Sequence, residues 1–392
     1  MAETAVSAND PLSNQLWSRK LYVEALKRAI IMKFVGTDSN SIIQVKDELS
    51  KNSGDQVTVG LRMQLNGDGV SGDSTLDGEE EELERYNDSL QINQLRHAVK
   101  VVGNMSQQRV PWSIRAEGES GLSDWWAGRM DASGFNQLCG NSVGQTNTKY
   151  TGMQVALPPS ANRVLFADFF ENGAYDTSVA AASSDANVGN YVAGAGATDV
   201  REAPFRLELI DRAVVKARTS SPAIRPVAMA GGECYCQFLH PHQTLQLRQN
   251  STSGQWLDIQ RAAMTGGVVN KNPIYSGALG QFNNVILHEG VRVVFGNTTQ
   301  LGNNLGTSLG PAGDSTTNIA RSVFCGAQAA SIAFGRAHGY QGTEIRFRWT
   351  EILKDYDNQL GISAALIWGM KKMVFNSEDF ASITVSTYSP GV

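Results

Sequence analysis

The chain has 392 residues, 41% of them hydrophobic and 18% charged, and its formal net charge is −5. These values are typical of a folded protein with two or three core-sized units. They argue against a general nucleic-acid binder, which carries a surplus of Lys and Arg. The sequence has no apolar stretch near the roughly 18 residues of a membrane span, and its four cysteines are too few for a disulfide framework. We therefore expect folding in a reducing cytoplasm, without a membrane partner.

The first expected element is an N-terminal helix. Asp10 is suited to cap it, and Pro11 to occupy its first position. Residues 16–34 also favour a helix, and Trp17 belongs to its apolar face.

The most informative local pattern is an alternation of apolar and polar residues. Its apolar members are Val57, Val59, Leu61, Met63 and Leu65. A period of two predicts a strand with one apolar face. The strand runs into a tip rich in Gly and Asp at 67–78. An acidic block follows, made of Glu79, Glu80, Glu81 and Glu82.

A second extended run returns through Tyr86, Leu90 and Ile92. Its apolar phase slips by one at Leu95, which predicts a bulge. Residues 57–99 would then form one hairpin arm. Because an isolated two-stranded hairpin is marginal in water, its apolar face needs a surface in the same chain or in a neighbour. The arm therefore indicates assembly.

Two helical regions are expected after the arm. Residues 107–138 favour a long helical segment, broken near Pro111 and Gly118. Residues 199–218 favour a second helix. Between them, residues 172–197 are rich in Gly, Ala and Ser without a period, which predicts a loop or insertion.

The rest of the chain is expected to be rich in strands. Short apolar strands separated by Gly and Asn turns are predicted from 225 to 321. Two long strands, 345–355 and 360–375, close the fold and are joined near Asp357 and Asn358.

The pattern nearest to a metal site is Cys234, Cys236, His240 and His242, since thiolates and imidazoles bind zinc. Its spacing is C-x-C instead of the C-x2-4-C of common structural sites, and Pro241 would end the strand between the two histidines. We therefore expect small buried cysteines in a core strand. No metal or other cofactor is predicted.

Residues 140–144, Gly-Asn-Ser-Val-Gly, have the spacing of a nucleophile elbow, which must follow a strand and open a helix. Here they follow an expected helix end, so a Gly-rich helix exit is predicted. The acidic residues of the hairpin tip lack the order of a calcium loop. They favour a solvated tip or a docking surface for basic side chains of a neighbour. No catalytic residue is predicted.

Several segments, in order, resemble the major capsid proteins of tailed bacteriophages, in the branch typified by coliphage N-four. Residues 224–247 resemble the strand and His-Pro-turn-helix element of that branch. Residues 272–280, 325–335 and 354–376 fit the same family. The family usually has Gly where this chain has Asp357, a departure at a turn.

The resemblance implies an α+β fold of the Hong Kong 97 type. The divisions that it implies are an N-terminal arm (1–50), an extended β-hairpin called the E-loop (51–103), a P-domain with a spine helix and an insertion loop (104–224), an A-domain (225–330), and the return strands of the P-domain with the C-terminal segment (331–392).

The resemblance also implies that pentamers and hexamers of the chain form an icosahedral head. That head encloses double-stranded DNA, which is bound without sequence specificity. Scaffolding, portal and decoration proteins are the implied partners, and the virion is the implied location. Subunit contacts are expected at Trp17, Val57, Val59, Leu61, Arg62, Met63, Leu65, Glu79, Glu80, Glu81 and Glu82.

Some shells of this fold cross-link an E-loop lysine to an asparagine of a neighbour. Between Asp55 and Val99 this chain has no lysine, so a non-covalent shell is predicted. The N-terminus has no long, charged helical extension, so a separate scaffolding protein is expected.

Three other hypotheses remain open from the sequence. An encapsulin-like compartment would have the same fold but enclose protein cargo. A metal-dependent hydrolase would use the Cys and His cluster, and a carbohydrate-binding module would account for the strands and the scattered Trp. The contents of purified particles, metal analysis and glycan binding would distinguish them.

Overall fold

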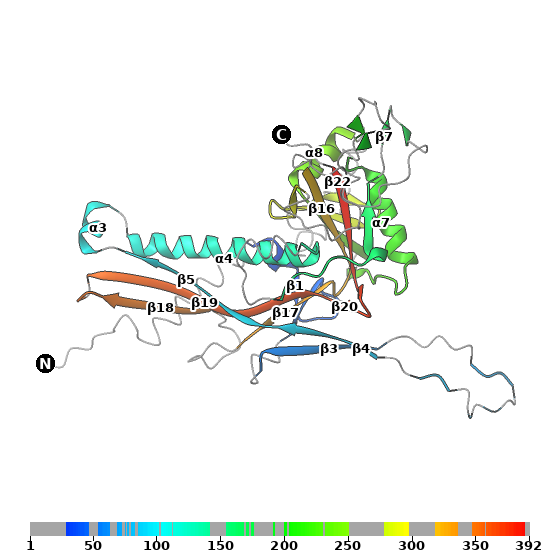
Figure 1. The fold of residues 1–392 in the computed structure, drawn as a ribbon, viewed down its shortest axis with the longest axis horizontal. Helices are drawn as coiled ribbons and strands as arrows, with labels where there is room; N and C mark the ends of the chain where they lie inside the picture. The colour runs from blue at the N-terminus through cyan, green and yellow to red at the C-terminus, as the bar shows by residue number, and fades with distance from the viewer. Residues whose placement is uncertain are drawn as a thin grey trace.

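The structure is a computed structural model of the full chain. It describes residues 29–46, 54–62, 69–72, 75, 77, 80–82, 85–101, 103–111, 113–141, 154–167, 170–171, 174–175, 191–192, 200–201, 204–229, 232–250, 278–297, 318–335, 347–356 and 358–388. An elongated part, made of a long helix on a long sheet, joins a second part built around another sheet, and a hairpin projects near their junction (Figure 1).

The helical elements are η1 (Ile31–Phe34), α3 (Asn104–Arg109), α4 (Ile114–Leu138), η2 (Ala161–Arg163), α7 (Leu207–Thr219) and α8 (Pro241–Asn250). The strands are β1 (Val35–Gly36), β2 (Ile43–Lys46), β3 (Gln56–Arg62), β4 (Arg85–Gln91), β5 (Asn93–Lys100), β6 (Val164–Phe166), β7 (Phe170–Glu171), β8 (Ala174–Tyr175), β9 (Tyr191–Val192), β10 (Val200–Arg201), β11 (Val227–Met229), β12 (Gly232–Leu239), β13 (Ala278–Phe282), β14 (Val285–Glu289), β15 (Phe295–Asn297), β16 (Asn318–Cys325), β17 (Ala330–Phe334), β18 (Phe347–Lys354), β19 (Gln359–Lys372), β20 (Val374–Phe375), β21 (Glu378–Asp379) and β22 (Ser382–Tyr388).

Strand β19 is the centre of a six-stranded sheet, called here the long sheet. The order is β1-β2-β17-β19-β18, and β5 also pairs with β19. The first half of β19 lies between β18 and β5, so that Gly361 stands opposite both Ile352 and Lys100. Its second half pairs with β17. The two long strands predicted at 345–355 and 360–375 are thus confirmed as β18 and β19.

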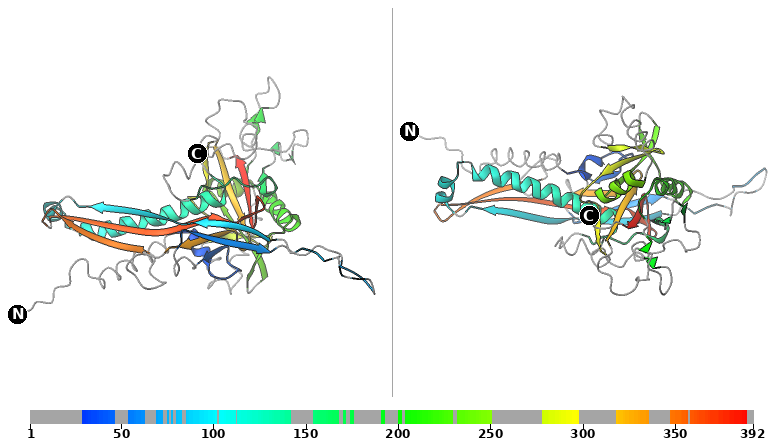
Figure 2. Two further views of the ribbon diagram at one scale, coloured as in Figure 1. Left: turned by 60° about the horizontal axis from the view of Figure 1, so that its bottom comes forward. Right: turned by 90° about the horizontal axis from the view of Figure 1, so that it is seen from above.

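Helix α4 lies along one face of the long sheet (Figures 1 and 2). Ser113 caps the helix, and its hydroxyl accepts a backbone N–H at 3.4 Å. A Cβ added at Gly118 would meet Ile362 at 3.5 Å and Val99 at 3.8 Å. The helix continues through Gly118, where a break was predicted, and this residue is buried against the sheet at ordinary contact distances. The break near Pro111 is confirmed, between α3 and α4.

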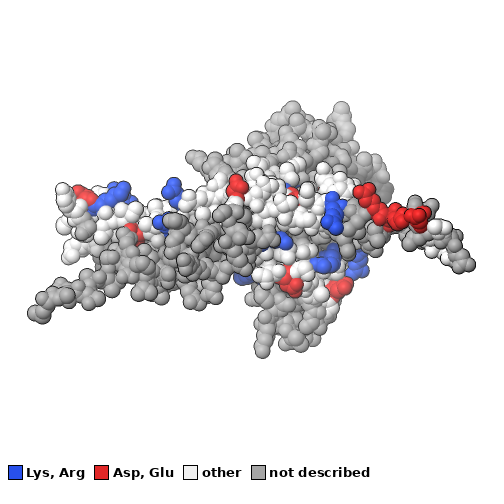
Figure 3. Space-filling model, turned by 90° about the horizontal axis from the view of Figure 1, so that it is seen from below, with Lys and Arg blue, Asp and Glu red and all other residues white. Residues whose placement is uncertain are grey.

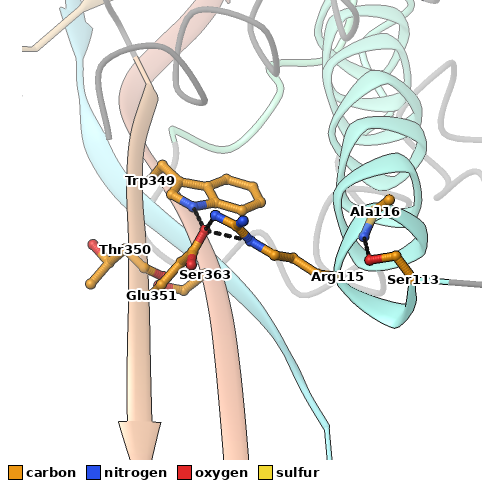
Figure 4. A network of polar contacts seen from close by, with 7 residues as sticks. All are labelled: Ser113, Arg115, Ala116, Trp349, Thr350, Glu351 and Ser363. Carbon is orange, nitrogen blue, oxygen red and sulfur yellow. Dashed lines mark hydrogen bonds and ion pairs between the residues drawn. The ribbon is translucent and has the colours of Figure 1, made fainter. Parts of the chain in front are cut away.

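A buried carboxylate ties the first turn of α4 to the edge strand β18. Glu351 is 3% exposed, and its Oε1 accepts hydrogen bonds from Nε and Nη2 of Arg115 at 3.1 and 2.5 Å. Trp349 Nε1 donates to the same oxygen at 2.7 Å (Figure 4). These donors offset the desolvation of the carboxylate and fix where the helix begins on the sheet.

The second part is built on an eight-stranded sheet, called here the second sheet. Its order is β13-β14-β12-β16-β22-β6, with β11 also paired to β12 and β15 to β16. Helices α7 and α8 lie beside it (Figure 1). Phe135, near the end of α4, contacts Phe238 of β12 edge to face at 5.6 Å. Helix α4 therefore reaches from the long sheet into the core of the second one.

The predicted hairpin arm is shorter than expected. Strand β3 pairs with β4, Val57 opposite Leu90, but β5 leaves the hairpin and pairs with β19 over its whole length. The phase slip after Ile92 is therefore a change of sheet and not a bulge. When a strand leaves one sheet and joins another, the side of the strand that faces the core can change, and its apolar residues then shift by one position. A β-bulge shifts the apolar pattern in the same way.

Other predicted elements differ in their ends or type. The helix predicted from 199 begins at Leu207, after Pro204, because the residue before a proline is disfavoured in a helix. Helix α8 lies where the strand pattern predicted only strands, as the resemblance implied. Of the predicted helix 16–34, the structure describes only residues 29–34, and these end in the 3-10 helix η1. Asp10, Pro11 and most of 172–197 lie outside the described residues.

Gly369 tests how the hairpin sits on the long sheet. A Cβ there would lie 2.0 Å from the carbonyl oxygen of Gln91, so Gly369→Ala should force the base of the hairpin away and lower the free energy of unfolding by about 1–3 kcal/mol. Gly60→Ala in β3, whose Cβ would meet nothing within 4 Å, is the matched control. Denaturant unfolding of both variants checks this, and equal losses would contradict it.

Candidate assembly surface

The base of the hairpin is packed onto its own chain. Val57 and Leu90 are 3% and 2% exposed and form a small cluster with Ala333 of β17, against which Val59 and Ile92 pack. The side chain of Val57 therefore offers almost no area to another subunit, contrary to its predicted role. The surface that the apolar face of the hairpin requires is, at this end, supplied by β17.

An ion pair anchors the same end of the hairpin. Lys371 of β19 contacts Asp88 of β4, and its Nζ also donates to the carbonyl oxygen of Ser89 at 3.1 Å. The second carboxylate oxygen of Asp88 accepts the N–H of Val374 at 3.1 Å. Both charged side chains are about nine-tenths buried, so each depends on the other for its stabilisation.

Lys372, which follows Lys371 in β19, points to the opposite face of the strand and makes a second ion pair. Lys372 Nζ lies 2.8 Å from Asp379 and donates to the carbonyl oxygen of Pro158 at 3.1 Å. Asp379 also accepts the N–H of Ser160 at 3.3 Å. Burial lowers the pKa of Lys372 and raises that of Asp379, and the charge of each partner opposes the shift of the other.

Sequence reasoning missed both lysines, although a signal was present. They stand side by side within the otherwise apolar end of a long strand, where Met370, Met373 and Phe375 surround them. Charged residues at such positions indicate buried ion pairs, because an unpaired buried charge is strongly unfavourable.

Further along the hairpin, Leu61 is half-buried. With Val59 it lines a cavity of about 50 Å³ against Ala330, Met373 and Phe375. Of the other predicted contacts, Trp17, Met63, Leu65 and Glu79 lie outside the described residues, and so does the side chain of Arg62.

The acidic block is exposed at the projecting end of the hairpin. Glu80, Glu81 and Glu82 are all exposed, as is Asp77 nearby. In Figure 3 acidic side chains gather into one block at this end of the molecule. The hairpin thus combines a base fixed to its own chain with a charged end that projects from it.

The cysteines of the candidate metal pattern are buried in the second sheet. Cys234 and Cys236 lie in β12, and all four cysteines are free. Burial raises the pKa of Cys236, and it raises that of Cys139 to about 12, which keeps these thiols protonated. Within the described ranges, no group of three or more potential ligands comes together. The prediction of buried core cysteines is confirmed.

The two histidines instead form an aromatic stack with Phe295. The ring centroids of His240 and His242 are 4.7 and 4.6 Å from that of Phe295, with planes 7° apart. Nδ1 of His240 accepts the N–H of His242 at 3.3 Å in the first turn of α8, so it acts as a helix cap. Burial, and then the neighbouring His242, lower the pKa of His240 to about 4.

The start of the motif at 140–144 is a helix exit, as predicted, and its residues 142–144 lie outside the described residues. Gly140 follows the end of α4 with φ of +67°, a conformation that favours glycine. A Cβ there would lie 2.6 Å from Pro159 and 2.7 Å from the carbonyl oxygen of Leu157. In the part of the chain that the structure describes, no helix is long and apolar enough to span a membrane.

A long helix on a long sheet, a second sheet at its end and a projecting hairpin define a subunit of a phage capsid. The chain belongs to the phage capsid protein family, whose model matches residues 5–391. It is 31% identical over 394 residues to the major capsid protein of Pseudomonas phage KPP25, which covers 94% of this chain and 93% of that protein.

Solved capsid structures show the same fold. The capsid of Ralstonia phage GP4 matches with a TM-score of 0.72 and 28% identity, over 100% of this chain and 99% of that one. The Cyanophage Pam1 capsid asymmetric unit matches with a TM-score of 0.64 and 19% identity, over 100% of both chains. The α+β capsid fold predicted from the resemblance is thereby confirmed.

The chain is therefore a major capsid protein, which forms the head shell of a tailed phage. This family is structural and not enzymatic. The matches do not support the encapsulin-like compartment or the metal-dependent hydrolase.

The contributions of Asp88 and Lys371 to the stability of the protein should depend strongly on each other. Asp88→Ala leaves Lys371 buried without its carboxylate, and we expect a loss of about 3 kcal/mol in the free energy of unfolding. Lys371→Met should partly restore the stability of the Asp88→Ala variant, because it removes the uncompensated charge. Denaturant unfolding of the single and double variants measures this coupling. Additive losses would contradict it, and Asp77→Ala, at an exposed aspartate, is the control.

The cap at His240 should make the fold sensitive to acid. Between its ordinary pKa of 6.5 and about 4, the unfolded chain binds a proton at this site and the folded chain does not. The neutral His240 therefore contributes its full stabilisation above pH 6.5. As the pH falls from 6.5 to 4, the free energy of unfolding decreases by up to about 3 kcal/mol. His240→Asn keeps a capping oxygen and cannot titrate. Its melting temperature should fall less over this range than that of the unaltered chain, and parallel curves would refute the role.

Proposed function

We propose that the chain assembles as pentamers and hexamers into an icosahedral head that encloses double-stranded DNA. The observation that carries this is the hairpin. Its base is fixed to β17 and β19, while every described residue from 69 to 82 except Val70 is exposed. An exposed arm on a rigid base suits contact with a neighbouring copy, since a two-stranded ribbon gains stability only from a surface.

The proposed domain division follows the elements. Residues 1–50 are the N-terminal arm, 51–103 the E-loop region, 104–224 the P-domain with α4 as spine helix, 225–330 the A-domain, and 331–392 the return strands and the C-terminal segment. The position of α4 along the long sheet supports the name of spine helix. Strands β6 and β22 join the second sheet from outside 225–330, so the two sheet-based parts interlock in sequence.

The contacts proposed between copies combine apolar and charged groups of the arm. Leu61, Met63 and Leu65 supply apolar area, worth roughly 1.5–3 kcal/mol for each side chain that becomes fully buried. The acidic block sets the orientation of docking, since exposed ion pairs contribute little to affinity. Arg62 and Trp17 are proposed as further contacts.

The proposed partners are a separate scaffolding protein, a portal protein and a decoration protein, with assembly in the host cytoplasm. The packaged DNA is held without sequence-specific binding. The net charge of −5 supports this, because the chain has no overall surplus of basic residues to bind phosphates.

Shell formation is tested with the recombinant chain, alone and with its scaffolding protein. Negative-stain electron microscopy and sedimentation should show closed shells, pentamers or hexamers. A strict monomer under every condition would refute the proposal.

A non-covalent shell is the second expectation. Mature particles boiled in detergent should run as a single band near 42.3 kDa on denaturing electrophoresis, because the arm between Asp55 and Val99 has no lysine to cross-link. A ladder of multimers would contradict it.

A further inference from the structure

Two free cysteines face each other across neighbouring strands of the second sheet. Cys236 of β12 is directly paired with Cys325 of β16 in antiparallel register. Residues paired in this way point to the same face of a sheet, and their Cα atoms lie about 4.5–5.5 Å apart. A disulfide joins residues whose Cα atoms lie about 4.4–6.8 Å apart. The register of these strands therefore provides the spacing that a bond between the two sulfurs requires.

The side chains beside this pair are small and buried. On its other side Cys325 is paired with Ser382 of β22, so three short side chains stand in a row across one face of the sheet. Both cysteines are 0% exposed, and Ser382 is buried as well. A disulfide removes two hydrogen atoms and draws the sulfurs to about 2.05 Å from each other. It therefore needs no additional room in the close-packed core of the sheet.

The other two cysteines are placed less well for this bond. Cys234 precedes Cys236 by two positions in β12, and an extended chain sets such residues about 6.7 Å apart, at the upper limit for a disulfide. The thiol of Cys234 donates to the carbonyl oxygen of Val227 at 3.7 Å. The thiol of Cys139 donates to the carbonyl oxygen of Arg321 at 3.3 Å. The cross-strand pair is therefore the favoured one among the four cysteines.

Burial makes the cross-strand pair slow to react. Burial, and then Cys234 and Cys325, raise the pKa of Cys236. Burial, and then Cys139, raise the pKa of Cys325. Because the thiolate is the form that reacts, oxidation is slow while the sheet is closed. In a reducing cytoplasm both thiols persist, whereas outside the cell nothing reduces them again. Slow oxidation therefore follows folding and assembly and does not compete with them.

We propose that Cys236 and Cys325 form an intrachain disulfide after the head has left the reducing cytoplasm. The oxidant is a small hydroperoxide, since a larger reagent does not reach buried sulfurs. One thiolate attacks a peroxide oxygen, the O–O bond breaks, and a sulfenic acid and hydroxide form. The second thiolate attacks that sulfur, the S–O bond breaks, and the disulfide forms as hydroxide leaves. With the two thiol protons, hydrogen peroxide is reduced to two molecules of water.

The bond ties β12 to β16 across the segment that separates them in the sequence. That segment contains β13, β14 and β15, which pair beside these two strands in the second sheet. Closing so long a loop restricts the unfolded chain and should raise the melting temperature. The bond lies within one chain, so it adds no band of multimers on denaturing electrophoresis. It goes beyond the proposed function, on which only its timing rests.

A count of thiols on the full-length chain tests the proposal. The chain is freed of reductant, treated with hydrogen peroxide for several hours, unfolded and alkylated. Since the chain has four cysteines, its intact mass should show four alkyl groups before treatment and two after it. Reductant should restore all four. The melting temperature of the oxidised chain should lie at least about 5 °C above that of the reduced chain.

Single substitutions identify the pair. Cys236→Ser and Cys325→Ser should each keep three thiols after treatment and show no rise in melting temperature. Cys325→Ala serves the same purpose if the serine variant does not fold. Cys234→Ser and Cys139→Ser are the matched controls, because each removes a buried cysteine outside the pair. Both controls should lose two thiols and gain stability as the unaltered chain does.

Three outcomes would overturn the proposal. The first is four alkylated thiols in the treated, unaltered chain. The second is a loss of thiols that reductant does not reverse, since this marks oxidation to sulfinic or sulfonic acid. The third is a loss of two thiols in Cys236→Ser or in Cys325→Ser, which would assign the bond to another pair. If the chain forms the disulfide but no shells, the proposed function fails and the disulfide stands.

Discussion

Two adjacent lysines at the end of β19 hold the parts of this molecule together. Successive residues of a strand point to opposite faces, so Lys371 reaches Asp88 of the hairpin while Lys372 reaches Asp379, beside the second sheet. Each pair is buried, and neither lysine is stable there without its carboxylate. The hairpin, the long sheet and the second sheet therefore have one defined arrangement, which a shell subunit needs in order to present the same surfaces in every copy.

Close approach of backbones completes this arrangement. Gly369 lets Gln91 cross directly over β19, and Gly118 of α4 faces Val99 of β5 and Ile362 of β19. At the far end of the helix, a Cβ on Gly134 would lie 2.2 Å from Ile31. Glycine weakens a helix or a strand in isolation. At Gly369 the backbone of Gln91 comes closer than any side chain would allow.

Local patterns predicted much of this fold, and long-range pairing explains what they missed. The alternation from Val57 predicted the hairpin, and Pro111 predicted the break before α4. The slip after Ile92 was read as a bulge, because nothing near it reveals that β5 pairs with a strand more than 250 residues later. Arg96 and Arg348 come to lie on opposite sides of Ala365 only through the register of both strands on β19.

The position of Lys371 also determines how force passes through the subunit. A neighbour that pulls on the hairpin transmits tension through Asp88 to the end of β19, along the direction of that strand. The hydrogen bonds from β19 to β17, β18 and β5 run across that direction, so they are sheared together and do not open one by one. Such a load would therefore be shared among three strand pairings, along the line from the arm to the far end of the long sheet.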